Sequence, residues 1–392
     1  MKPVAISRMT VTSALGAGNA THVQALRDGR SGLGPCRFED VALTCHVGEV
    51  AGVDAIALPA ELEAYDCRNH RLAWLGLQQD GFRAAVRAAR ERHGAQRVAV
   101  LLGSSTSGIL QTEHAYRRRG PDGALPPDFH YAETHNTASL ARFVAQALQL
   151  EGPQWVVSTA CSSSAKVFAA AARLMALGWI DAAVVGGVDS LCLTTLYGFN
   201  SLELLSPQAC RPWDAGRNGL SLGEAAAFAL MERDAARPEG WLLGAGESSD
   251  GYHMSSPLPD GGGAVAAMRQ ALAGAGLEPG DIDYINLHGT ATHNNDASED
   301  RAVSAVFGAA VPCSSTKGAT GHTLGAAGGV EAVLSLLALQ QGLIPGGLNR
   351  RQPDPELHAN YVDRSRAAPL RRVLSNSFGF GGSNASLIFG AA

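Results

Sequence analysis

Cys161 is the residue whose position most strongly suggests chemistry, because it separates a strand-like run from a helix-like run. Two β-branched residues, Val156 and Val157, precede it, and an Ala- and Leu-rich run ending at Gly178 follows it. As a buried spacer, a cysteine here could be replaced by any small residue. A nucleophile gains more from this position, since the peptide dipoles and free N–H groups of a helix N-terminus stabilise a thiolate. The local sequence leaves both interpretations open.

Three further segments place reactive or glycine-rich residues at strand ends. His288 ends the strand-like run DYINLH, and Lys317 and His322 lie in STKGATGH, ahead of a small-residue helix. The third segment, SNSFGFGGSN at 375–384, lacks the GxGxxG spacing and following helix of a dinucleotide site. Either histidine alone is more often a hydrogen-bonded structural residue than a catalytic one. Function gathers at the carboxyl ends of strands in open α/β sheets, so these segments can converge with Cys161 on one site.

The elements that must position these residues alternate between strand and helix, which is typical of an α/β fold. Strands are predicted at 98–104, 154–159, 182–188 and 225–232, with helices at 138–150 and 162–177. After a polar stretch from Asp234 to Gly240, strands are predicted at 241–248, 283–288, 311–315 and 386–390, with helices at 263–276 and 325–340. We therefore expect two similar βαβ-rich halves, 1–236 and 237–392. The long irregular segments 115–137 and 192–222 are expected to be functional or to make contacts.

The composition excludes several classes of protein. The chain has 392 residues, is 46% hydrophobic and carries a net charge of −5, which indicates a large apolar core and no bulk affinity for nucleic acid. The N-terminus lacks an uninterrupted apolar stretch, so we read no signal peptide, and we expect no membrane span. The seven cysteines form no CxxC pair, which argues against a zinc site or a disulfide framework and favours the reducing cytoplasm.

Six ordered motifs together resemble one family. They are TACSSS, CRPWDAGRNGLSLGEAAAF, SSDGYHMSSP, HGTAT, STKGATGHTLGAAGG and NSFGFGGSN. The chain resembles the β-ketoacyl-acyl carrier protein synthases, the condensing enzymes of fatty-acid and polyketide synthesis, nearly end to end. The resemblance implies a thiolase-like fold with a layered α-β-α-β-α core.

The resemblance implies a decarboxylative Claisen condensation, with Cys161 as the acylated nucleophile. An oxyanion hole would use the backbone N–H groups of Cys161 and Phe380, which the glycines around Phe380 bring close to the substrate. His288 and His322 would donate hydrogen bonds to the enolate formed when a malonyl thioester loses CO2. Lys317 and Glu299 match a supporting pair that orients and polarises the histidines. No metal or redox cofactor is expected.

The resemblance also implies residues that bind the substrate. Phe378 matches a residue that disfavours the malonyl carboxylate, and Phe380 matches a ring that moves once the cysteine is acylated. Thr290 and Thr292 match hydroxyls that hold the phosphopantetheine arm, with Ser255 assisting. Gly381 is expected to contribute to the binding turn.

Two departures bear on the acyl group. His293 stands where family members often have proline, and segment 128–137, which often lines the acyl pocket, is unusually polar. His130 or His135 could face a functionalised chain, although solvent-facing side chains explain them equally simply. We hypothesise a non-standard acyl group, aromatic or polyunsaturated, as in pigment or polyketide pathways.

The resemblance implies an acyl carrier protein as partner, together with a homodimer or a heterodimer. Two alternatives stay open: an obligate heterodimer with a chain-length-factor-like subunit, and a thiolase, which condenses without decarboxylation and normally needs a second, C-terminal cysteine. An acidic carrier protein would meet arginines, whose attraction salt screens. The candidate arginines are Arg68, Arg71, Arg117, Arg118, Arg119 and Arg211.

Overall fold

The computed structural model describes all residues, 1–392, and its strands form one large mixed sheet in two sections. The first section has the order β1-β9-β7-β5-β6, and the second has the order β10-β17-β16-β11-β12-β14. The strands β1 and β10 pair antiparallel and join the two sections. The bounds are β1 Val4–Ser13, β5 Val98–Gly103, β6 Gln154–Val157, β7 Ala182–Asp189, β9 Ala225–Glu232, β10 Gly240–Ser249, β11 Tyr284–Asn286, β12 Pro312–Ser314, β14 Asn360–Tyr361, β16 Arg372–Gly379 and β17 Ser383–Gly390.

The two sections have the same topology. In the first, β9 is antiparallel to both β1 and β7, while β5 is parallel to both β7 and β6. In the second, β17 is antiparallel to both β10 and β16, while β11 is parallel to both β16 and β12. β6 and β12 thus occupy equivalent positions, and so do the turns that follow them. The expectation of two similar halves is confirmed.

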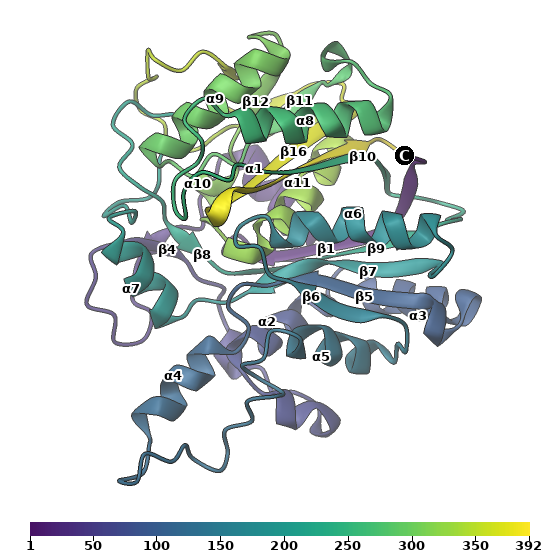
Figure 1. Ribbon diagram of the computed structural model, residues 1–392, viewed down its shortest axis with the longest axis vertical. Coiled ribbons are helices and arrows are strands. Elements are labelled where there is room, and N and C mark those ends of the chain that lie inside the picture. The colour runs from purple at the N-terminus through teal and green to yellow at the C-terminus, as the bar shows by residue number, and fades with distance from the viewer.

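Helices form three layers around the two sections, which gives the predicted α-β-α-β-α order (Figure 1). The central layer contains α6 and α11, which contact each other and strands of both sections. The outer layer over β10 and β17 contains α8 and α9, and the opposite one contains α2, α3 and α5. The bounds are α2 Arg68–Leu77, α3 Phe82–His93, α5 Ser139–Leu148, α6 Ser163–Ala176, α8 Gly262–Ala275, α9 His293–Phe307 and α11 Ala327–Gln341.

The central position of α11 follows from its sequence. It is apolar on every side, and every residue from Ala327 to Leu339 is buried, as expected for a helix surrounded by protein. Gly328 allows the close contact with α6, because a Cβ at that position would lie 2.6 Å from the backbone nitrogen of Ala165. The window Leu324–Gln341 is long and apolar enough to span a membrane, but 89% of it is buried inside the protein. This helix is therefore part of the core.

Smaller elements complete the fold. A three-stranded sheet has the order β3-β4-β8, and a two-stranded sheet pairs β13 with β15. The bounds are β2 Gly16–Ala17, β3 Gly34–Pro35, β4 His46–Gly48, β8 Leu222–Gly223, β13 Leu343–Ile344 and β15 Arg366–Ala367 for strands, and α1 Asn19–Asp28, α4 Ile109–Arg117, α7 Leu193–Ser201 and α10 Lys317–Thr320 for α-helices. The 3-10 turns are η1 Val53–Ala55, η2 Ala60–Tyr65, η3 Ala95–Arg97, η4 Pro279–Asp281, η5 Leu324–Ala326 and η6 Phe380–Gly382.

All the predicted strands and helices are present, with shifts of a few residues at their ends. The sequence analysis missed β1, the strand that links the two sections, because Arg8 and several hydroxyl residues interrupt its apolar pattern. It also missed α7, which lies within the segment 192–222 that was read as irregular, and β16, much of which lies in the segment 375–384 that was read as a turn. The helices α1, α2, α3, α4, α9 and α10 were not predicted either. Tertiary packing stabilises these elements more than their local pattern does.

Candidate active site

Cys161 lies between β6 and α6, as predicted. Ala160, just before it, has a φ of +51°, so the chain turns sharply and presents the cysteine immediately ahead of the helix. The side chain is buried, with 5% of the residue exposed. Gly379 packs against this turn so closely that a Cβ would lie 2.8 Å from the carbonyl oxygen of Thr159 and 3.2 Å from the backbone nitrogen of Cys161. The backbone N–H of the next residue, Phe380, lies close enough to the Cys161 sulfur to lower the pKa of its thiol.

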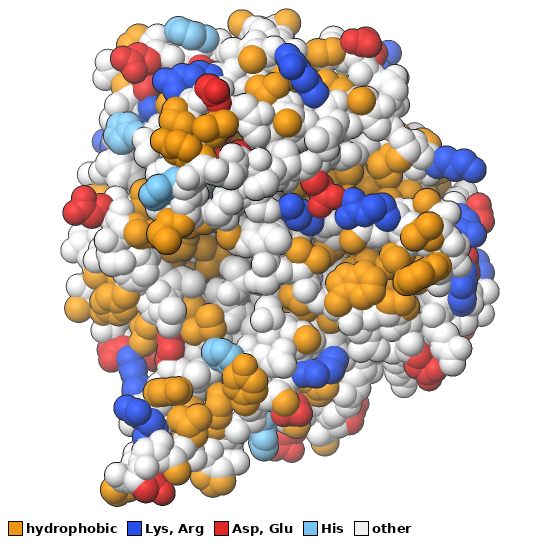
Figure 2. Space-filling model, viewed as in Figure 1, with side chains coloured by type: hydrophobic (Ala, Val, Ile, Leu, Met, Phe, Trp, Pro, Cys, Tyr) orange, Lys and Arg blue, Asp and Glu red, His pale blue; other side chains and the backbone are white.

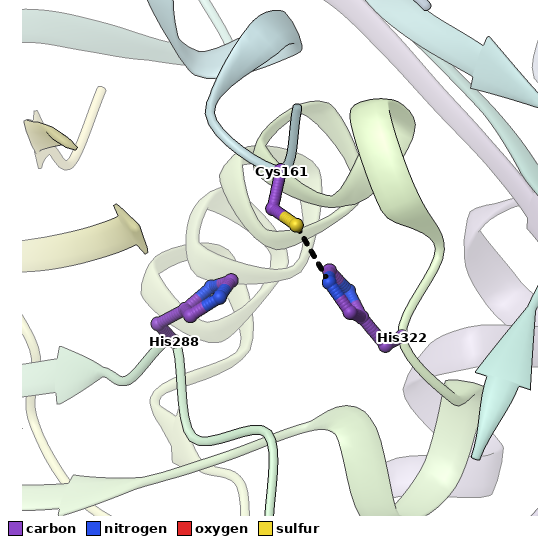
Figure 3. Close-up of side chains that lie close together, drawn as sticks. All are labelled: Cys161, His288 and His322. Atoms are coloured by element: carbon purple, nitrogen blue, oxygen red, sulfur yellow. Dashed lines mark hydrogen bonds between the residues drawn. The ribbon is translucent and has the colours of Figure 1, made fainter. Parts of the chain in front are cut away.

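His322 reaches the sulfur from the equivalent turn of the other half, which leads from β12 to α11. Its Nε2 lies 2.9 Å from the Sγ of Cys161 (Figure 3). The backbone of His322 is held on both sides by the β8 region: its N–H donates to the carbonyl of Ser221 at 2.7 Å, and its carbonyl accepts from the N–H of Gly223 at 2.9 Å. The internal symmetry of the fold thus brings the two side chains into contact.

His288 completes the group, and Glu299 positions it. The two imidazole rings of His288 and His322 lie 5.4 Å apart at 89°. The Glu299 carboxylate accepts the backbone N–H groups of His288 and Gly289, each at 2.8 Å, and also the Asn376 side-chain amide at 3.2 Å. Glu299 therefore fixes the chain that carries His288 and does not touch the ring through these bonds.

Lys317 points at the His288 ring, but its ionic partner is Glu331 and not Glu299. The Lys317 Nζ lies 3.4 Å from His288 Nδ1 and also forms a buried ion pair with Glu331 of α11. Lys317 and Glu299 therefore each contact the His288 segment, Lys317 at the ring and Glu299 at the backbone. An ammonium group has no acceptor, so Nδ1 must accept and the ring proton sits on Nε2. The Nε2–H of His288 is thereby a fixed donor.

Burial dominates the protonation of the three central groups. It raises the pKa of the Cys161 thiol to about 11, although the Lys317 ammonium and the Phe380 N–H oppose the shift. It lowers the pKa values of His288 and His322 well below the ordinary value, and Lys317 lowers both further. The site therefore rests as a neutral thiol with two neutral imidazoles. Stabilisation of a Cys161 thiolate by the helix N-terminus stays a prediction.

The three donor atoms of Cys161, His288 and His322 lie within 4.8 Å of one another, a spacing that a metal ion could use. The chemistry of the donors does not fit a metal, because the Lys317 ammonium occupies the acceptor nitrogen of His288 and leaves an N–H on the other nitrogen. An N–H cannot act as a metal ligand.

A cavity of about 410 Å³ opens onto this group, and most of the predicted substrate residues line it. Phe378 lies beside His288, with ring centroids 5.9 Å apart. The lining residues that were predicted are Cys161, Ser255, His288, Thr290, Thr292, His322, Phe378 and Phe380. Gly381 is not among the lining residues; its φ of +78° and its N–H bond to the Met254 carbonyl indicate a role in the turn itself.

Three residues of this region were missed by sequence reasoning. Phe199 of α7 stacks on the ring of Phe380, with centroids 5.5 Å apart. Asn376 binds Glu299, and Glu331 neutralises Lys317. Only Glu331 carried a signal, as the single charged residue in an otherwise apolar predicted helix, since lone buried charges require partners.

The predicted arginine patch is not a single surface. Arg68 is buried, and its guanidinium binds Glu224, Asp54 and Glu49, so the expectation that it meets a carrier protein is wrong. Arg71 pairs with Asp66, and Arg211 donates to the Gly216 carbonyl. Arg117 to Arg119 are exposed at the end of α4, where the first two pair with Asp40 and Asp128. Contact between these three and a carrier protein stays a prediction.

The two histidines proposed to face the acyl chain do not line the cavity. His135 bonds to the Thr112 hydroxyl at 2.6 Å and stacks with Tyr131, at a centroid distance of 5.1 Å. His130 is exposed. That the enzyme binds a functionalised acyl chain against segment 128–137 stays a prediction.

Comparison with known proteins agrees with this geometry. Residues 1–236 match the family described as beta-ketoacyl synthase, N-terminal domain, and residues 240–351 match its C-terminal domain. The chain is 32% identical to 3-oxoacyl-[acyl-carrier-protein] synthase 2 of Synechocystis, over 99% of this chain and 98% of that protein. It is 40% identical to the corresponding enzyme of Rhizobium meliloti over 74% of this chain and 73% of that protein.

The ketosynthase ApeO of Xenorhabdus doucetiae, solved in complex with its chain length factor ApeC, superposes with a TM-score of 0.92 at 39% identity, covering 99% of this chain and 98% of that one. The ishigamide ketosynthase/chain length factor gives a TM-score of 0.90 at 27% identity, covering 100% and 99%. These similarities extend over the whole fold, including the turns that bring Cys161, His288 and His322 together. The chain belongs to the β-ketoacyl synthase family and is an acyltransferase of the 3-oxoacyl synthase class.

Proposed function

We propose that this enzyme joins an acyl group held on Cys161 to malonyl-acyl carrier protein, with loss of CO2, in fatty-acid or polyketide synthesis. The observation that carries the proposal is the contact between Cys161 and His322 at the base of a cavity that His288 also lines. A nucleophile and a proton acceptor within hydrogen-bond reach are the minimum for acyl transfer.

In the first half-reaction, the Cys161 sulfur attacks the thioester carbonyl of the acyl carrier. Because the thiol rests protonated, its proton passes to His322 Nε2 as the S–C bond forms. The Phe380 N–H, which faces the sulfur, and the Cys161 N–H are the donors for the tetrahedral oxyanion. Collapse of that intermediate expels the phosphopantetheine thiolate, which takes the proton back from His322.

In the second half-reaction, malonyl thioester loses CO2 and the electrons of the broken C–C bond form an enolate. The Nε2–H of His288, fixed by Lys317, donates to the enolate oxygen. His322 can donate as well, since its Nδ1 has no partner within the protein and either tautomer is available. The enolate carbon then attacks the acyl-Cys161 carbonyl and the C–S bond breaks. The released thiolate takes up one proton from solvent, which balances the negative charge of the malonyl carboxylate that leaves as CO2.

No metal or redox cofactor enters this sequence of steps, because proton transfer and carbanion attack balance without one. The thiolase alternative fits less well. A thiolase uses a second cysteine as acid and base, and among the seven cysteines only Cys161 lines the cavity.

We further propose a heterodimer with a chain-length-factor-like subunit, the kind of complex named for the two ketosynthase neighbours. The strand β6 is the edge of the large sheet and has no neighbour on its outer side. Hydrophobic side chains gather over β6 and the end of α6 (Figure 2), where Trp155 is 36%, Leu177 67% and Trp179 64% exposed. An exposed sheet edge with large apolar side chains favours pairing with another chain.

Seven free thiols also fit a reducing compartment such as the cytoplasm.

Two measurements test the activity. Intact-mass spectrometry after incubation with acyl carrier proteins that bear saturated, polyunsaturated or aromatic chains is expected to show one acyl group on Cys161, and the chain that loads fastest identifies the substrate class. A clear preference for plain saturated chains would contradict the hypothesis of a functionalised chain. Release of CO2 from malonyl carrier protein is expected and separates the enzyme from a thiolase.

The partner is tested by co-expression with the related subunit of the host and native mass spectrometry. A mixed dimer that Trp155→Lys dissociates supports the proposal, whereas a stable homodimer with full activity refutes it.

A further inference from the structure

A second cysteine pair lies outside the catalytic group, in the small sheet. Cys36 follows β3 and Cys45 precedes β4, and the Cys36 N–H donates to the Cys45 carbonyl at 2.9 Å. The register of Gly34 with Val47 and of Pro35 with His46 places the two cysteines directly opposite each other. Both belong to one apolar cluster, so their side chains lie on the same face of the hairpin.

The spacing of this pair suits a disulfide. Directly opposite residues of a hydrogen-bonded antiparallel pair have Cα atoms about 5.5 Å apart. Disulfides usually join Cα atoms roughly 4.4 to 6.8 Å apart. Both cysteines are free.

The two thiols differ in access. Cys36 is half-buried, whereas Cys45 is 4% exposed. Burial, together with Cys36, raises the pKa of the Cys45 thiol to about 12. Cys36 is therefore the thiol that an external reagent meets first, and Cys45 is placed to resolve the product.

The hairpin is connected to the catalytic histidine through backbone contacts. β4 pairs with β8, with Val47 opposite Leu222. The residues flanking Leu222 hold the N–H and the carbonyl of His322. β4 and β8 lie side by side in Figure 1. The strand β4 also packs tightly against the segment that carries His322, because a Cβ on Gly48 would lie 2.5 Å from the Thr320 carbonyl oxygen. A movement of β4 would therefore move that segment as well.

We propose that Cys36 and Cys45 form a thiol–disulfide site whose oxidation lowers the condensing activity. In exchange with a small disulfide such as oxidised glutathione, the Cys36 thiolate attacks one sulfur and releases one glutathione thiol. The Cys45 thiolate then attacks the Cys36 sulfur of the mixed disulfide and releases the second. The protein loses two hydrogens, and the small disulfide is reduced to two thiols. The S–S bond is only about 2 Å long, so the two sulfurs move closer than two separate thiols can, and the paired strands β4 and β8 transmit this shift to His322.

The test treats the full-length protein with oxidised glutathione and follows it by intact mass and peptide mapping. The expected result is a mass lower by about 2 Da with a Cys36–Cys45 cross-linked peptide. Cys36→Ser is expected to abolish the shift, whereas Cys67→Ser, which changes a buried cysteine of another region, is expected to retain it. A stable glutathione adduct without the cross-link, or no modification, overturns the proposed site.

The effect on activity rests on the proposed function and is measured separately, as CO2 release before and after oxidation. A fall of about tenfold, reversed by dithiothreitol and absent in Cys36→Ser, is expected from a sub-ångström displacement of His322. A cross-linked enzyme with an unchanged rate overturns the link to the active site. A reduced enzyme that releases no CO2 instead contradicts the proposed function, and the mass result still stands by itself.

Discussion

Replacing Gly379 by alanine tests whether the contact between the glycine-rich turn and the nucleophile turn sets the active-site geometry. The backbone at this position has a φ of −105°, which alanine adopts without strain, so the effect is steric. The new Cβ would lie 2.8 Å from the Thr159 carbonyl oxygen, and the two turns must separate by about 0.6 Å to reach the 3.4 Å of an ordinary contact. That movement withdraws the Phe380 N–H from the Cys161 sulfur.

The size of the effect follows from the role of that donor. A misplacement of about 1 Å costs on the order of a hundredfold in rate, and loss of one oxyanion donor costs about 10²- to 10³-fold. We therefore expect acylation of Cys161 to slow by about 10- to 100-fold. Decarboxylation of malonyl carrier protein, which depends on the histidines, is expected to remain within about threefold of the wild-type rate.

The assay is stopped-flow or quenched acylation followed by intact mass, with CO2 release and thermal unfolding measured on the same samples. Gly280→Ala is the matched control, because a Cβ there meets nothing within 4 Å. Acylation within twofold of wild type in Gly379→Ala would refute the assignment of the Phe380 N–H to the oxyanion hole. An equal loss of acylation and decarboxylation would instead indicate general damage to the fold.

Three other outcomes are expected. Cys161→Ala abolishes acylation but retains CO2 release, whereas His288→Ala retains acylation and lowers CO2 release by about 10²-fold, as measured by both assays in parallel. Glu331→Gln leaves the Lys317 ammonium buried without its ionic partner, so the free energy of unfolding falls by about 3–5 kcal/mol in urea titrations. The double variant Lys317→Met with Glu331→Leu removes both charges. It restores the free energy of unfolding but not the release of CO2. Burial lowers the pKa of His70 from 6.5 to about 4. As the pH falls from 6.5 toward 4, the unfolded chain binds a proton at this ring and the folded protein does not, so the free energy of unfolding decreases. His70→Gln should therefore remove about 2 kcal/mol of the wild-type loss in stability between pH 7 and pH 5, and an unchanged pH slope in denaturant melts would contradict the buried neutral ring.

The sequence by itself determined the elements whose pattern is local. The alternation of apolar strands with helices predicted α/β layers. The reactive residues at strand ends indicated that their segments could converge, and the family resemblance assigned Cys161, His288 and His322 to one site. The equivalent turns after β6 and β12 explain why this worked, since each places its side chain at a helix start near the centre of the molecule. β1 was not predicted, because pairing with β9 and β10 stabilises it and its own polar-interrupted pattern does not.

The tertiary structure alone decided which charged groups are paired and which thiols are neighbours. Sequence reasoning named Glu299 beside Lys317 and missed Glu331, because only the packing of α11 in the central layer brings the Glu331 carboxylate to the ammonium. Arg68 looked like a surface residue until the fold placed Glu224 against it in the interior. Electrostatic partners, desolvation and cross-strand contacts depend on distances between segments far apart in the chain, and those distances exist only once the two halves have packed together.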